Sequence, residues 1–85
     1  MKEFEFQIIA ARGLHAQLAA ELAQMVQSSK SQVYLTKGTK SVNLGRSIEI
    51  LSLGIGPGDA VRITVVGEDE GALCERLKEY FEMKL

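Results

Sequence analysis

The sequence contains few of the residues from which metal sites, disulfides and catalytic groupings are built. Cysteine, histidine and proline each occur once in the 85 residues, and tryptophan is absent. A single cysteine cannot form a disulfide within the chain, and one cysteine with one histidine cannot supply a Cys/His zinc site. We therefore expect no metal ion, and we expect Cys74 to be a packed thiol on the apolar stripe of the last helix.

Strong charge of one sign and long apolar runs are also missing. The formal net charge is −1, and the chain lacks the clustered basic stripe that a nucleic-acid-binding surface requires. No segment approaches the roughly 18 apolar residues of a membrane span, and residues 1–9 lack the unbroken apolar core of a signal peptide. We expect a cytoplasmic protein that neither inserts into a membrane nor binds nucleic acid.

Strand and helix patterns alternate along the whole chain, whose length and 46% hydrophobic residues suit one domain, residues 1–85. Period-two alternation and β-branched runs predict strands over 2–9, 32–37, 40–44 and 60–67. Apolar residues at helical spacing predict helices over 16–27, over about 47–54 with Ser47 as its N-cap, and over the segment after Gly67. The order β-α-β-β-α-β-α predicts an α+β fold with one sheet and all helices on one of its faces.

The only histidine, His15, falls at the junction between the first strand and the helix over 16–27. The first N–H groups of that helix, among them those of Ala16 and Gln17, lack partners within the helix, so this end attracts anions. The same positive end favours a neutral, nucleophilic imidazole. No adjacent nucleophile and base can be identified, so we interpret a working His15 as a carrier of a transferred group. The alternative is a histidine that only caps the helix or lies on the surface.

Two separated motifs, "GLHA" at 13–16 and "VNLGRSIEILSLGI" at 42–55, followed by the "GPGD" turn, resemble the histidine-containing phosphocarrier (HPr) family of the bacterial phosphoenolpyruvate:sugar phosphotransferase system. The resemblance covers essentially the whole chain. It implies an open-faced β-sandwich with a four-stranded antiparallel sheet in order 1-4-2-3 and three helices on one side. It also implies that Nδ1 of His15 takes a phosphoryl group from enzyme I and passes it to an enzyme IIA, without a metal or an organic cofactor.

The resemblance further implies a docking surface for these partners beside His15. On this interpretation the contacts come from the apolar residues Leu18, Ile48, Leu51 and Ile55, with Arg46 and Ser47 beside them. Exposed apolar patches often mark such transient interfaces. For Leu18 and Leu51, a place in the core is an equally good interpretation.

The chain departs from the family pattern at two places. The family motif continues from His-Ala to Arg-Pro, whereas this chain has Gln17 and Leu18. Gln17 offers a phosphate only a neutral amide, and we hypothesise that Arg12 partly replaces the missing guanidinium. The regulatory serine of many family members aligns with Arg46, and for Ser47, one place later, we favour a helix N-cap over a phosphorylation target.

These departures leave two alternatives to a phosphocarrier. One is an HPr-like regulatory module that binds a metabolic enzyme or a transcription regulator with weak or no phosphotransfer. The other is a small-molecule-binding α+β domain that shares only the two-layer design, because a fold alone does not determine function. Phosphorylation of His15 distinguishes the three.

Overall fold

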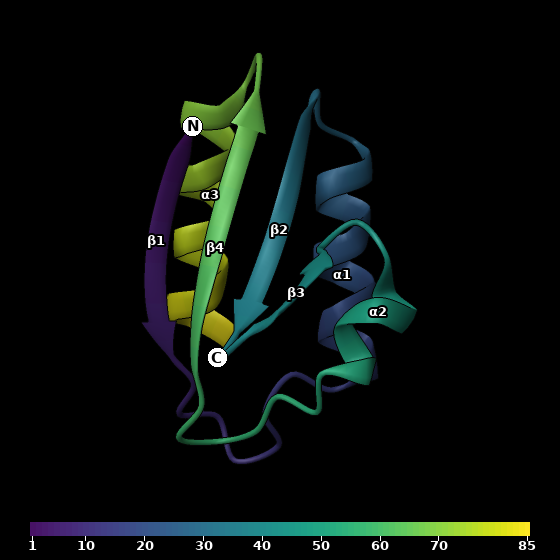
Figure 1. Cartoon of the computed structure of the whole chain (residues 1–85), viewed down its shortest axis with the longest axis vertical. Coiled ribbons are helices and arrows are strands. Elements are labelled where there is room, and N and C mark those ends of the chain that lie inside the picture. Colours follow the sequence, from purple (N-terminus) through teal and green to yellow (C-terminus); the bar gives the residue numbers. More distant parts are fainter.

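The computed structural model describes residues 1–85, and its centre is a four-stranded antiparallel sheet. The strands are β1 (Lys2–Gln7), β2 (Ser31–Lys37), β3 (Lys40–Asn43) and β4 (Ala60–Gly67). They lie side by side in the order β1-β4-β2-β3, as Figure 1 shows. The predicted strand order 1-4-2-3 is confirmed.

Three helices form the second layer, and none of them is long and apolar enough to cross a membrane. They are α1 (Ala16–Gln27), α2 (Ser47–Ser52) and α3 (Glu70–Lys84). α1 and α3 lie behind the sheet in Figure 1, and the short α2 packs against α1 near the β3 edge. The other face of the sheet carries no helix, so the architecture is the expected two-layer, open-faced α+β sandwich.

The core lies between the sheet and the helices and contains 19 buried residues. Phe81 of α3 is fully buried, and the rings of Phe4 and Phe6 from β1 meet it edge to face, with centroids 5.7 and 5.5 Å away. Cys74 is buried in the same core, which confirms the packed thiol, and burial raises the pKa of that thiol. Phe4 and Phe6 thus lie on the inner face of β1, as the period-two alternation predicts for a half-buried strand.

The first strand is two residues shorter than the alternation predicts. The N–H of Ile8 bonds to the carbonyl of Asp59 at 2.8 Å, and the N–H of Ile9 bonds to the carbonyl of Leu85 at 2.8 Å. Because these partners lie outside the β1–β4 ladder, the chain leaves the sheet after Gln7 and enters the β1–α1 loop, residues 8–15. Ile9 is consequently exposed.

The predicted N-cap of the second helix is wrong. Arg46, not Ser47, occupies that position: its backbone is extended, and its carbonyl accepts the first helical bond, from Ile50 N–H at 3.1 Å. The reason lies in the preceding turn, where the Asn43 side chain accepts the N–H of Gly45 at 2.7 Å and the Asn43 carbonyl accepts that of Arg46. This turn brings Arg46 to the helix start, and Ser47 becomes the first residue of α2.

Candidate functional site

His15 occupies the N-cap position of α1, and its imidazole is not used to cap the helix. Its backbone is extended (φ −87°, ψ 178°), and its carbonyl accepts the N–H of Ala19 at 2.9 Å. The side chain makes no capping hydrogen bond and is partly exposed. The ring nitrogens are therefore available for chemistry with an incoming group, which an imidazole engaged in capping would not offer.

The backbone around His15 provides hydrogen-bond donors for an anion. Ala19 N–H is the first to bond within α1, so the N–H groups of Ala16, Gln17 and Leu18 have no helical acceptor. The first turn of α1 contains no acidic residue that would compete for this positive end of the helix. A phosphoryl group attached to the ring would meet unpaired N–H groups and a favourable dipole.

Gly13 and Leu14 hold this histidine against a second loop, the α2–β4 loop, residues 53–59. Gly13 has a φ of +61°, and a Cβ there would lie 2.4 Å from the carbonyl oxygen of Ile55. The next residue, Leu14, is buried and donates its N–H to that same carbonyl at 3.1 Å. Only glycine permits both the positive φ and the close approach, which explains why Gly-Leu precedes the histidine.

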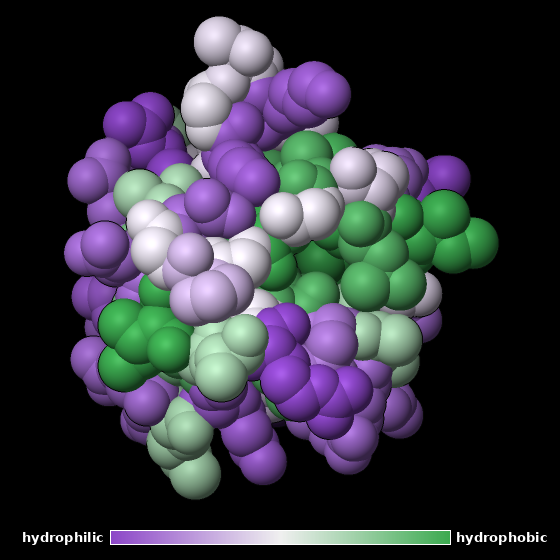
Figure 2. Space-filling view, turned by 90° about the horizontal axis from the view of Figure 1, so that it is seen from below, coloured by the Kyte–Doolittle hydropathy of each residue, from purple (hydrophilic) through white to green (hydrophobic).

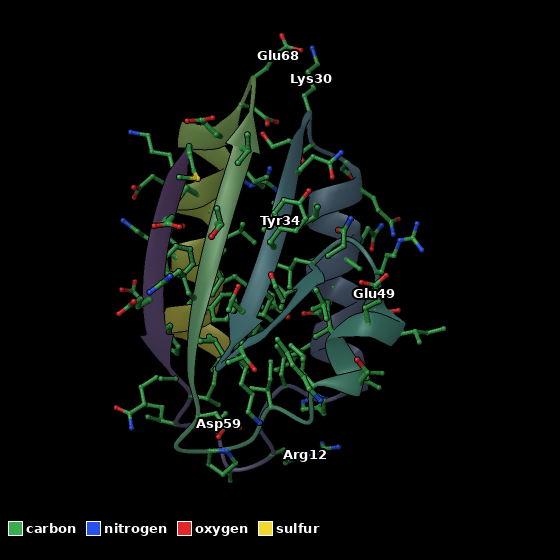
Figure 3. All side chains as sticks on the ribbon, in the orientation of Figure 1. Arg12, Lys30, Tyr34, Glu49, Asp59 and Glu68 are labelled. Carbon is green, nitrogen blue, oxygen red and sulfur yellow. The ribbon has the colours of Figure 1, made fainter.

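The two side chains proposed for phosphate lie in different settings. Gln17 is exposed on the first turn of α1, one turn before Glu21. The pKa of Glu21 is lowered chiefly because the Tyr80 hydroxyl donates to it at 2.6 Å, and Gln17, Lys84 and His15 act in the same direction. Arg12 is exposed in the β1–α1 loop at the end of the molecule that also holds Asp59 (Figure 3), and it takes part in no ion pair.

The structure separates the four apolar residues expected on the docking surface into two pairs. Ile48 and Leu51 of α2 are 83% and 42% exposed, whereas Leu18 and Ile55 are only 8% and 6% exposed. Leu18 of α1 and Ile55 of the α2–β4 loop both belong to the buried core cluster. For Leu18 this decides between the two interpretations in favour of the core, and Ile55, expected on the docking surface, is corrected to a core residue. Figure 2 shows this end of the molecule with apolar atoms on its α2 side that continue toward the centre.

Arg46 and Ser47 lie at the start of α2, beside the exposed pair. The Arg46 side chain is 71% exposed and lies 3.6 Å from the carboxylate of Glu49. Ser47 is partly buried in the first turn. The apolar surface of α2 therefore has a cation at its edge.

Sequence reasoning missed the contact between Lys37, at the end of β2, and Asp59, in the α2–β4 loop. Their side chains form an ion pair at 2.9 Å, although the residues are 22 positions apart. The only signal was Asp59 itself, at the end of the "GPGD" turn. Its carboxylate accepts the N–H of Gly56 at 2.8 Å, which together with Lys37 lowers the pKa of Asp59.

The fold is an open-faced sandwich with one partly exposed histidine at a helix N-terminus, next to a helix that carries two exposed apolar side chains. These features define a class of small domains with a single histidine at the site. The family model described as "PTS HPr component phosphorylation site" matches residues 2–83. The chain therefore belongs to the HPr family.

Relatives agree with this assignment over nearly the full chain. The phosphocarrier protein HPr of Xylella fastidiosa (strain Temecula1) is 30% identical over 82 residues, which is 96% of this chain and 92% of the relative. The crystal structure of HPr-C-His from Thermoanaerobacter tengcongensis is 34% identical with a TM-score of 0.90, and the match covers 96% of this chain and 92% of that one. Crh, the catabolite repression protein of Bacillus subtilis, whose crystal structure is a swapped, intertwined dimer, is 29% identical with a TM-score of 0.77, over 100% and 98% of the two chains.

Proposed function

We propose that this protein is a phosphocarrier of the phosphotransferase system. In this proposal, Nδ1 of His15 attacks the phosphorus of the phosphohistidine on enzyme I. A new N–P bond forms as the N–P bond to enzyme I breaks, and the group later leaves for an enzyme IIA in the same way. The carrier would meet both partners in the cytoplasm, and it needs no cofactor because the reactive phosphoryl group is made elsewhere.

The observation that carries the proposal is the imidazole of His15, which is not used for capping and lies next to unpaired N–H groups of α1. The transferred group carries negative charge on its oxygens. Donors that are already in place stabilise that charge without reorganisation, because the helix fixes their directions. A carrier must release the group again, and neutral N–H donors bind it less strongly than ionised side chains would.

Arg12 and Gln17 are proposed to complete the phosphate site together with the N–H groups of Ala16 and Gln17. Arg12 has no ion-pair partner, so its guanidinium is free to approach a phosphoryl group three residues away in sequence. The Gln17 amide contributes a neutral donor. We expect Arg12→Ala to slow phosphorylation, whereas Arg76→Ala, an exposed arginine on α3, should leave the rate unchanged.

Partner binding is proposed to rest on Ile48 and Leu51, with Arg46 and Ser47 at the edge. The two apolar side chains are exposed on a helix that packs beside α1, so one partner surface can cover them and still reach His15. The neighbouring Arg46 favours an acidic rim on the partner. Donor and acceptor would use this surface in turn, which requires each complex to be transient.

The test is phosphorylation by enzyme I and phosphoenolpyruvate, followed by intact mass and acid treatment. We expect a gain of one phosphate that acid removes, because phosphohistidine is acid-labile, and no gain in His15→Ala. No gain in the wild-type chain with its cognate enzyme I would contradict the proposal.

A second candidate is an HPr-like regulatory module that binds a metabolic enzyme or a transcription regulator. Two observations favour it: Gln17 and Leu18 stand where the family has Arg-Pro, and Crh, a catabolite repression protein, is similar over the full chain. This module would keep the α2 surface and bind its partner whether or not His15 is phosphorylated. Unchanged partner binding by His15→Ala, together with no phosphorylation of the wild type, would favour it.

A further inference from the structure

Lys37, the last residue of β2, uses its ammonium group to bind three acceptors on a different part of the chain. Its Nζ lies 2.9 Å from Oδ2 of Asp59, 3.3 Å from the carbonyl of Leu53 and 3.2 Å from the carbonyl of Gly54. A lysine ammonium has three donor hydrogens, so this arrangement can use all of them. The side chain is about one-third exposed, which sets it apart from a freely solvated surface lysine.

These acceptors lie at the two ends of the α2–β4 loop. Leu53 and Gly54 follow directly after α2, where free carbonyls carry partial negative charge that a cation stabilises. Asp59 lies immediately before β4, and its Oδ2 also accepts the N–H of Gly56 at 2.8 Å. Lys37 therefore ties the end of α2 and the start of β4 to one point on the sheet.

The same loop supports the β1–α1 loop that carries His15. The carbonyl of Ile55 accepts Leu14 N–H at 3.1 Å, and the carbonyl of Asp59 accepts Ile8 N–H at 2.8 Å. Gly58 N–H returns to the carbonyl of Ile8 at 2.7 Å. The position of His15 relative to α2 thus depends on how the α2–β4 loop is held, and Lys37 and Asp59 hold it.

We propose that Lys37 and Asp59 are positioning residues that fix the β1–α1 loop, and with it His15, against α2 and its exposed apolar surface. Neither residue forms a hydrogen bond or an ion pair with the imidazole. They act through the carbonyl of Ile55 and the backbone of Gly58 and Asp59. The consequence for phosphotransfer rests on the proposed function. The geometric part of the proposal can be tested without it.

The geometric test is amide hydrogen exchange measured by NMR, with global stability measured by urea unfolding for each variant. Lys37→Met keeps the length of the side chain and removes its charge and donors. We expect Leu14 N–H to exchange about fivefold faster, or more, than the change in global stability accounts for, because a charge-assisted bond is lost. Leu73 N–H, bonded to the Asp69 carbonyl in α3, should change no more than global stability requires.

Two further lysine variants make the comparison specific. Lys40→Met is the matched control, since Lys40 pairs with Lys37 across the β2–β3 hairpin, is exposed and forms no ion pair. It should leave Leu14 exchange unchanged. Lys37→Arg keeps the charge and should restore most of the protection. Equal changes at Leu14 and Leu73 in Lys37→Met, or no change at Leu14, would overturn the proposal.

The functional test is the initial rate of His15 phosphorylation. We expect Lys37→Met and Asp59→Asn each to slow it about threefold or more under conditions where both remain folded, whereas Lys40→Met reacts like the wild type. Wild-type rates in Lys37→Met and Asp59→Asn would overturn the positioning role even if Leu14 exchange increased. If the wild type itself is not phosphorylated, the proposed function fails, and the exchange of Leu14 alone decides whether the two residues position the loop.

Discussion

Side chains at the two ends of the sandwich form different hydrogen bonds and ion pairs. At the end away from His15, where Figure 3 labels Lys30 and Glu68, the Asp69 carboxylate accepts the N–H of Lys30 at 3.0 Å and the hydroxyl of Ser31. Glu70 accepts the N–H of Gly67 at 3.1 Å and pairs with the N-terminal amine at 2.6 Å. Polar contacts between the loops therefore close this end.

At the end that carries His15, hydrogen bonds join the β1–α1 loop to the α2–β4 loop, but other groups there have no partner. Lys37 ties the α2–β4 loop to the end of β2 through Asp59. The N–H groups of Ala16 and Gln17, however, lack helical partners, and Ile48 and Leu51 remain exposed. Unpaired donors and exposed apolar side chains do not stabilise the free chain. An anion or a partner that covers them would make them favourable, which agrees with the proposal that phosphate and partners bind at the end that carries His15.

The largest effect should come from the glycine at the loop contact. Gly13→Ala forces a side chain into a positive φ and places Cβ 2.4 Å from the carbonyl oxygen of Ile55, so we expect it to lower the free energy of unfolding by at least about 3 kcal/mol. Gly54→Ala, with a φ of +60° and no atom within 4 Å of its Cβ, should cost only about 1 kcal/mol. Urea unfolding measures both, and equal losses would contradict a tight loop contact.

The second prediction compares the loss of stability at a core residue with that at a residue of the proposed docking surface. Leu18→Ala should lower the free energy of unfolding by about 2–3 kcal/mol, because it leaves a cavity in the core. Ile48→Ala, at a residue that is 83% exposed, should cost less than about 0.5 kcal/mol but raise the KM for phosphorylation by enzyme I. A stability loss as large as that of Leu18→Ala, or an unchanged KM, would remove Ile48 from the proposed docking surface.

We expect low pH to lower the stability of the folded chain by protonating Asp69 at one end and Asp59 at the other. The pKa of Asp69 is lowered first by the Ser31 hydroxyl and then by Lys30 N–H, and that of Asp59 first by Gly56 N–H and then by Lys37. A lowered pKa in the folded chain adds stability above the unfolded pKa of about 3.9, and that stability is lost as the pH falls through the folded pKa. We expect Asp69→Asn and Asp59→Asn each to flatten the acid side of the stability profile.

Thermal unfolding between about pH 2 and pH 7 measures this acid dependence. Glu68→Gln is the control, since Glu68 is exposed at the far end and forms no ion pair or side-chain hydrogen bond. Its profile should match that of the wild type. Profiles in both asparagine variants as steep as the wild-type profile would show that the two carboxylates do not tie the loops together.

The smallest effect is a gain at the phosphate site. Gln17→Arg adds an ionised donor beside His15, and we expect phosphorylation about threefold to tenfold faster, since charge-assisted bonds are stronger than neutral ones. Gln24→Arg adds the same charge on an exposed position two turns further along α1 and should have little effect. Equal rates in the two variants would indicate that the neutral residue at 17 does not limit phosphate binding.

The order and most bounds of the elements could be predicted because they follow local periodicity. The helix over 16–27 and the strand over 60–67 have the predicted bounds, since one has a regular apolar stripe and the other a β-branched run between glycine-containing turns. Ser47 was misassigned because the helix start is set by the Asn43 side chain, a contact that no helix pattern reports.

The sequence alone predicted the position of a candidate site residue only where that position follows from local sequence, as it does for His15. His15 at the start of α1 follows from the sequence, but whether an apolar residue such as Leu18 or Ile48 is buried depends on which loops cover it. The ion pair of Lys37 with Asp59 depends on two elements that meet only in the folded chain. Tertiary contacts of this kind leave no periodic trace in the sequence.

The most direct test of the account is a comparison of backbone amide NMR shifts before and after phosphorylation by enzyme I. We predict the largest shifts at Ala16, Gln17 and Leu18, whose N–H groups would face the phosphoryl group on His15, and little change at Lys30 and Ser31. A phosphorylated chain whose α1 amide shifts do not change, or whose largest shift changes lie at the far end, would contradict the proposal that the phosphoryl group is bound at the start of α1.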